Sequence, residues 1–194
     1  MSYAIVYDSR TGNTEALARA VAALPSEGRL AFGRVDEVDR AAVAQADRVY
    51  AGFWTNRGDC GDELAEVLAS LADKDVFLFG TAGFGADETY FAGVMARVAV
   101  HLPESARIVG TFMCQGRMPA SVRARYAQTA EAKPEQAARM HQLIENFDEA
   151  ASHPDDDDLR VCAKLSKRRA SMAKPASLPA SASMPRCGCP MRAS

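Results

Sequence analysis

Five short apolar runs, separated by stretches of helical periodicity, constrain the fold of this chain more than any other feature. The runs are nearly continuous rather than alternating, which is typical of strands buried on both faces of a sheet. They cover Tyr3–Tyr7, Leu30–Val35, Arg48–Phe53, Val76–Thr81 and Arg107–Met113. This order predicts an α/β fold, a doubly wound three-layer sandwich whose parallel sheet has helices on both faces.

The stretches between the runs carry apolar residues at helical spacing. Residues 14–24 place Leu17, Val21 and Leu24 on one stripe, and residues 62–71 and 91–102 repeat the pattern. Beyond the fifth run we predict a helix over 135–150 that starts next to Pro134. Its candidate inner positions are Ala138, His141, Leu143 and Ile144. A last helix is predicted to begin within 154–158, where clustered aspartates suit the positive end of a helix dipole.

Charge is distributed unevenly along the chain. The first 158 residues contain 15 Lys or Arg and 25 Asp or Glu, whereas residues 159–194 contain eight basic residues and no acidic one. An acidic body argues against general nucleic-acid binding. The end of the chain is mostly Ala, Ser, Pro, Met, Lys and Arg, a composition that buries too little apolar area to fold. We therefore predict a folded domain over residues 1–168 and a disordered basic tail over 169–194.

Five cysteines, odd in number and without a CxxC pair, indicate neither a disulfide framework nor a metal site. Free thiols fit a reducing compartment, so we expect a cytoplasmic protein. The first residues lead directly into a strand-like run, with no signal-peptide pattern and no long apolar stretch. No membrane insertion is therefore expected.

The turn after the first run gathers groups that suit a phosphate. It reads Ser9, Arg10, Thr11, Gly12, Asn13 and Thr14 and leads into the first helix. Hydroxyls, an amide and free backbone N–H groups at a helix N-terminus can hold a phosphate dianion. The alternative is a helix cap with a purely local role. In a doubly wound sheet, ligands bind at the carboxyl ends of the strands, so the position of this turn favours the binding interpretation. Neither GxxxxGK[ST] nor GxGxxG occurs here.

Residues 9–14 resemble the phosphate loop of flavodoxins, Ser/Thr-x-Thr-Gly-Asn-Thr, at every specified position. The resemblance extends over about residues 2–165. It implies a flavodoxin-like five-stranded parallel sheet of order 2-1-3-4-5 that binds FMN non-covalently. It also implies that the flavin ring lies between the loops after the third and fourth strands.

Those two loops each carry an aromatic residue among small residues. The first holds Phe53, Trp54, Thr55, Asn56, Arg57 and Gly58, and the second holds Thr81, Ala82, Gly83, Phe84 and Gly85. A flat ring needs π-faces on which to stack, and Trp54 and Phe84 are placed to supply them. The alternative is that these aromatic residues cover exposed core at the end of the sheet. Gly58 would let a peptide carbonyl rotate toward the flavin. The turn over 110–119 is similar to that of a bacterial subgroup of flavodoxin-like proteins and is expected to border the flavin, with Cys114 buried.

The resemblance implies an FMN-dependent carrier that passes electrons one at a time between a donor reductase and an acceptor reductase, rather than a stand-alone enzyme. The subgroup resemblance implies a system that reduces tetrapyrroles such as bilirubin. We expect a monomer that meets redox partner proteins and no nucleic acid.

Three alternatives stay open. An NAD(P)H:quinone oxidoreductase of the same superfamily would share the FMN loops. A response-regulator receiver would need an Asp after strand three and a Lys after strand five, where this chain has Phe53 or Trp54 and Met113 or Cys114. An interaction protein of this fold that has lost its flavin is the third.

Overall fold

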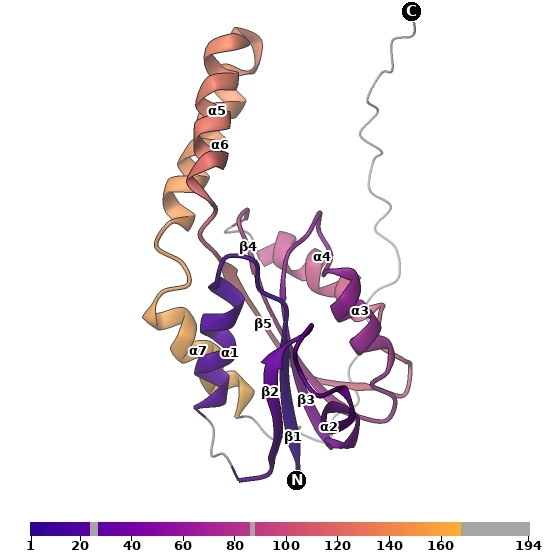
Figure 1. The fold of residues 1–194 in the computed structure, drawn as a ribbon. Helices are drawn as coiled ribbons and strands as arrows, with labels where there is room; N and C mark the ends of the chain where they lie inside the picture. The colour runs from indigo at the N-terminus through magenta and orange to yellow at the C-terminus, as the bar shows by residue number, and fades with distance from the viewer. Residues whose placement is uncertain (24–26, 86–87, 168–194) are drawn as a thin grey trace, which may run out of the picture.

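A computed structural model describes residues 1–23, 27–85 and 88–167, which form a five-stranded parallel sheet between two layers of helices (Figure 1). The strand order is β2-β1-β3-β4-β5. The elements are β1 (Tyr3–Tyr7), α1 (Asn13–Ala22), β2 (Arg29–Arg34), α2 (Arg40–Gln45), β3 (Arg48–Trp54), α3 (Asp62–Ala69), β4 (Asp75–Ala82), α4 (Glu88–Ala99), β5 (Arg107–Gln115), α5 (Ala120–Ala132), the 3-10 turn η1 (Pro134–Gln136), α6 (Ala137–Ala150) and α7 (Asp156–Ser166). The predicted fold class and strand order are confirmed.

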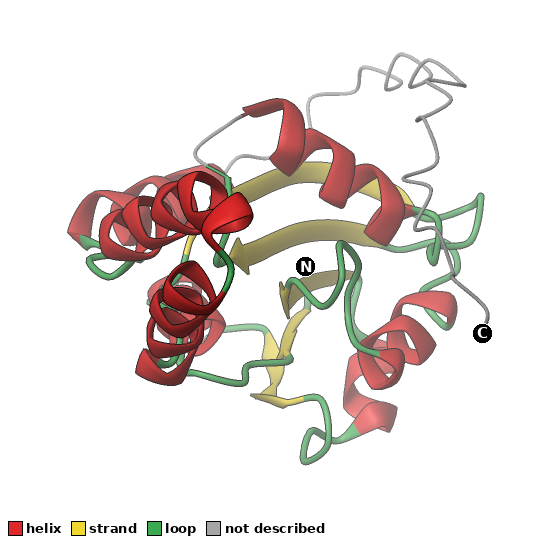
Figure 2. Ribbon diagram, turned by 90° about the horizontal axis from the view of Figure 1, so that it is seen from above, coloured by secondary structure: helices red, strands yellow, loops and turns green. Residues whose placement is uncertain are grey.

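Each face of the sheet has its own hydrophobic core, and seen from above the helices lie on both sides of the strands (Figure 2). Side chains alternate between the faces along each strand. In β1, Ala4 and Val6 join the core under α2, α3 and α4, while Ile5 joins the core under α1 and α7. Because all residues of β1 and β4 are buried, these strands read as continuous apolar runs.

A helical hairpin, α5 and α6, projects beyond the carboxyl end of the sheet (Figure 1). The predicted helix over 135–150 corresponds to α6, but α5 was not predicted. The sequence of α5 carries no apolar stripe from which a helix could be predicted, because no residue of this helix is buried and none needs to be apolar. Two expected inner positions of α6 are wrong: Ala138 and His141 are exposed. Since α6 packs in a hairpin rather than along the sheet, its buried face is instead formed by Met140, Phe147 and Ala150.

The last helix, α7, begins where the aspartate cluster predicts. Asp155 and Asp158 form a reciprocal cap: the Asp158 N–H donates to Asp155 Oδ1 at 2.9 Å, and the Asp155 N–H donates to Asp158 Oδ2 at 3.0 Å. This arrangement satisfies N–H groups that have no partner inside the helix. The predicted tail over 169–194 and the stripe position Leu24 lie outside the described residues.

Candidate cofactor site

The turn between β1 and α1 bends around the N-terminus of α1. Gly12 has a φ of 85°, a left-handed conformation that glycine adopts without strain, and this lets the chain enter the helix. The first N–H groups of the helix have no partner within it. One of them, the Glu15 N–H, donates a hydrogen bond to Ser9 Oγ at 3.2 Å. The turn therefore surrounds the positive end of α1 with polar groups, as a phosphate site requires.

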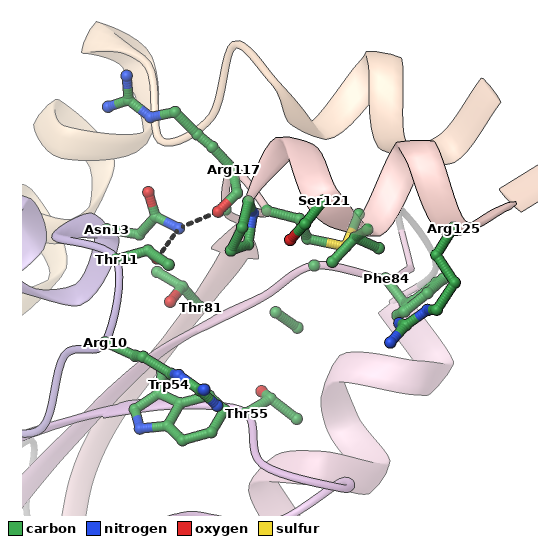
Figure 3. A pocket seen from close by; sticks show the side chains of 16 residues that line it. Arg10, Thr11, Asn13, Trp54, Thr55, Thr81, Phe84, Arg117, Ser121 and Arg125 are labelled. Atoms are coloured by element: carbon green, nitrogen blue, oxygen red, sulfur yellow. Dashed lines mark hydrogen bonds between the residues drawn. The ribbon is translucent and has the colours of Figure 1, made fainter. Parts of the chain in front are cut away.

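Asn13 connects this turn to the segment that follows β5. Its Nδ2 donates to Thr11 Oγ1 and to the Arg117 carbonyl, each at 2.9 Å (Figure 3). The residue is only 5% exposed, and its Oδ1 is buried without a partner in the described part of the chain. A buried acceptor without a donor is costly. This oxygen is also inaccessible to solvent, so the amide acts by holding the phosphate turn against the Arg117 segment through its Nδ2.

A cavity of about 440 Å³ opens beside Asn13 (Figure 3). Its volume falls within the roughly 300–1,000 Å³ of small-molecule sites. Nine residues of the predicted site line it: Arg10, Thr11, Asn13, Trp54, Thr55, Thr81, Ala82, Gly83 and Phe84. The opposite wall is formed by residues 116–119 and by Ser121, Val122 and Arg125 of α5. The structure thus brings the loops after β1, β3 and β4 together around one cavity, and the expected border by the turn after β5 is seen over 116–119.

Trp54 forms one side of the cavity. It was expected in a loop, but β3 extends to it, and it pairs with Thr81 of β4. Its Nε1 donates to Asp8 Oδ2 at 2.9 Å, and the Arg10 guanidinium lies 5.6 Å from its ring centroid. Burial raises the pKa of the Asp8 carboxyl, and the hydrogen bond from Trp54 opposes this shift. Asp8 orients the indole and was missed from the sequence, although it is the polar residue directly before the phosphate turn.

Phe84 is 37% exposed and lies between two cavities. The second cavity, of about 390 Å³, shares Thr55, Gly83 and Phe84 with the first. The Phe84 loop is held by Asn146 of α6, whose Nδ2 donates to the Gly83 carbonyl at 2.8 Å and whose Oδ1 accepts from Gly85 N at 3.3 Å. Asn146 could not be predicted as part of the site from the sequence, because it lies 61 residues from Gly85.

The turn after β3 is a tight two-residue turn. Arg57 and Gly58 both have positive φ, at 51° and 89°, and the backbones of Asn56 and Asp59 exchange hydrogen bonds of 2.7 and 3.0 Å. These features match a type I′ turn. Gly58 was expected to let a peptide carbonyl within residues 56–58 rotate; its own carbonyl accepts a 2.6 Å hydrogen bond from Arg97 Nε.

Six residues of the predicted site line neither cavity: Ser9, Gly12, Thr14, Phe53, Asn56 and Gly85. Thr14 is fully buried, and its hydroxyl lies 3.1 Å from that of Thr81. The Phe53 side chain does not form part of the cavity wall as expected. It is fully buried and covers Gly80 of the neighbouring strand, where a Cβ would collide with its ring. Strand alternation turns Phe53 into the core and leaves Trp54 beside the site.

The three described cysteines, Cys60, Cys114 and Cys162, are free and buried. Burial raises the pKa of the Cys60 and Cys162 thiols to about 12, so both stay protonated at neutral pH. Cys114 is a core residue, as expected.

The described residues also contain two clusters, each of three possible metal ligands. One consists of Asp59, Cys60 and His101, and the other of His153, Asp155 and Asp158. In each cluster the histidine already pairs with a carboxylate, at 3.1 and 2.6 Å. The absence of a metal site remains a prediction. Over the described ranges, every helix is too short or too polar to span a bilayer.

Named bacterial proteins and solved structures are similar to this chain. A protein of Clostridium symbiosum (strain WAL-14163), called flavodoxin-like domain-containing protein BilS, is 36% identical over 173 residues, which cover 82% of this chain and 90% of that protein. A protein of the same name from Clostridioides difficile (strain CD3) is 27% identical over 168 residues, which cover 86% of this chain and 95% of that protein. Among solved structures, oxidised flavodoxin 2 from Bacillus cereus matches with a TM-score of 0.49 and 17% identity, covering 86% of this chain and 95% of the other. The flavodoxin domain family model matches residues 4–167, and the chain therefore belongs to the flavodoxin family.

Proposed function

We propose that this protein binds FMN in the cavity beside the phosphate turn and carries electrons one at a time between a donor reductase and an acceptor reductase. The observation that supports this most strongly is the meeting of the phosphate turn with the loops after β3 and β4 around one ligand-sized cavity, which Arg10, Trp54 and Phe84 all line. A helix cap with a purely local role would not require three separate loops to meet at one cavity.

Each part of the site has a role in this proposal. The hydroxyls and N–H groups of residues 9–14 hold the phosphate at the positive end of α1. Trp54 and Phe84 enclose the flat ring, and Asp8 keeps the indole in position. FMN, when bound, supplies the redox chemistry, while the protein orients it and sets its surroundings. The exposure of Phe84 leaves one edge of the site accessible to a partner.

The acceptor in this proposal is an enzyme that reduces tetrapyrroles such as bilirubin. Support comes from the turn over 110–119, which is similar to that of the bacterial subgroup and of which residues 116–119 border the cavity. We further propose that the protein acts in the cytoplasm, since its described cysteines are unpaired thiols, and that it acts there as a monomer.

The alternative is an NAD(P)H:quinone oxidoreductase, and the second cavity beside Phe84 offers space for another ligand. The FMN-loaded protein alone, mixed with NADH and a quinone, separates the two functions. The carrier function predicts no catalytic turnover in this assay. Once the FMN-loaded protein has been reduced chemically, however, it should rapidly reduce an added one-electron acceptor. Sustained NADH oxidation by the pure protein would instead support the oxidoreductase.

A further inference from the structure

In the described part of the chain, the charged side chains that line the two cavities are all positive. Five arginines from five separate segments line them, and neither cavity is lined by a carboxylate within the described residues. This is unexpected in a body whose first 158 residues hold 25 acidic and 15 basic residues. The five residues, here termed the arginine rim, are Arg10, Arg57, Arg97, Arg117 and Arg125.

The charges of the arginine rim are not neutralised by neighbours. All five residues are exposed, and over the described ranges none forms an ion pair with a carboxylate. Arg10 and Arg125 instead lie over aromatic rings, at 5.6 and 5.8 Å from the ring centroids. By contrast Arg123, which shares α5 with Arg125, is paired with Asp148 through hydrogen bonds of 2.7 and 2.9 Å.

The arginine rim is spread over a wide area. The two cavities adjoin through Thr55, Gly83 and Phe84, and the rim includes residues on both of them. Figure 3 shows Arg10 and Arg125 at opposite sides of the larger cavity. One phosphate group, held by the turn over 9–14, can meet only the nearest of these guanidinium groups. An extended anionic surface is needed to meet them all, and the projecting hairpin that carries Arg125 lengthens the wall against which it would lie (Figure 1).

We infer that the arginine rim is the docking surface for a partner protein that presents an acidic patch, and that docking brings the partner to the Phe84 edge of the site. This inference rests on the proposed function, because it takes this edge as the place where electrons leave the protein. Opposite charges steer such an encounter and set its orientation. The association should weaken with salt, since exposed charges are screened over about 10 Å at 0.1 M ionic strength and about 30 Å at 0.01 M.

The test uses an acidic haem protein, cytochrome b5, as the probe, with binding measured by titration calorimetry. The full chain should bind it at about 0.01 M ionic strength and at least about tenfold more weakly at 0.1 M. A triple variant, Arg57→Ala, Arg117→Ala and Arg125→Ala, should bind at least about tenfold more weakly than the unchanged protein at low salt. The matched control removes three charges from the basic end of the chain, Arg168→Ala, Arg169→Ala and Arg186→Ala, and should change binding by less than about threefold.

Absence of binding at low salt, or equal losses in the two triple variants, would overturn the inference. Circular dichroism checks that the variants are folded, and the single variant Arg125→Ala, at an exposed helix position, should already weaken binding. Flavin absorption of the same samples is a separate readout. A protein that binds the probe through the arginine rim but holds no FMN would contradict the proposed function alone, whereas one that holds FMN but ignores the probe would contradict the docking surface alone.

Discussion

The two walls of the cavity are built in different ways. The wall formed by the ends of β1, β3 and β4 rests on a buried, hydrogen-bonded base: Asn13, Thr14 and Thr81 are at most 5% exposed. The wall formed by residues 116–125 belongs to a projecting segment whose helix α5 has no buried residue. A wall with a buried, preorganised base suits recognition of one fixed cofactor, and the exposed arginines Arg117 and Arg125 on the other wall suit a partner that comes and goes.

The largest effect is expected from the phosphate turn, on the wall formed by the strand ends. Thr11→Val removes the hydroxyl that contacts Asn13 and is available to a phosphate. A charge-assisted hydrogen bond contributes about 1.5–3 kcal/mol, so FMN affinity measured by equilibrium titration should fall by about tenfold to a hundredfold. The matched control is Thr129→Val in α5, which lines neither cavity and whose hydroxyl donates to the Arg125 carbonyl of its own helix. Equal losses of FMN affinity in both variants would show that the loss does not come from the phosphate turn.

A smaller effect on affinity, but a clear optical one, is expected from Trp54→Ala. Loss of a stacked aromatic partner costs about 0.5–1.5 kcal/mol, which is about two- to twelvefold in affinity. Flavin fluorescence that stacking quenches should reappear in the variant. The parallel variant Phe84→Ala shows which aromatic residue contributes more. If fluorescence stays quenched in Trp54→Ala, the indole does not lie on the ring.

Asn146→Ala tests the connection between the hairpin and the Phe84 loop. It removes the hydrogen bonds to the Gly83 carbonyl and to Gly85 N, so amide exchange at Gly85 should accelerate about tenfold, since each neutral bond contributes about 1 kcal/mol. FMN affinity should fall only about two- to threefold, because the loop loses a support and no ligand contact. Gln142→Ala, at an exposed position of the same helix, is the control. Unchanged exchange at Gly85 would mean that the hairpin does not hold the loop.

The smallest effect concerns Asp8 and pH. Burial raises the pKa of this carboxyl, so the folded protein holds the proton more tightly than the unfolded chain does. Its stabilising contribution is therefore present below the unfolded pKa and is lost as pH rises through the folded pKa. Asp8→Asn cannot titrate and still accepts from Trp54 Nε1, so its stability in urea unfolding should exceed that of the unchanged protein at pH 7 more than at pH 3. A difference that is independent of pH would contradict this assignment.

The wall formed by the strand ends could be predicted from the sequence, whereas of the other wall only the border by residues 116–119 could be. The phosphate turn is contiguous, and its position follows from a strand, Tyr3–Tyr7, whose predicted bounds coincide with β1. The hairpin has no such signal, because α5 carries no apolar stripe. The contacts that join the walls depend on tertiary structure: Asn13 reaches a carbonyl 104 residues away, and Arg97 reaches Gly58 across 39 residues. Phe53 and Trp54 were both predicted to lie in the loop after the third strand. Because β3 ends one residue later than predicted, at Trp54, strand alternation places the Phe53 ring in the core and the Trp54 ring beside the cavity.

The most direct test of the account is addition of FMN to the purified full chain, followed by gel filtration and a visible spectrum before and after reduction with dithionite. The account predicts about one FMN retained per chain, with an absorption that bleaches on reduction and returns in air. A colourless protein that gains no flavin absorption after reconstitution would contradict it and would leave a flavodoxin fold that has lost its cofactor.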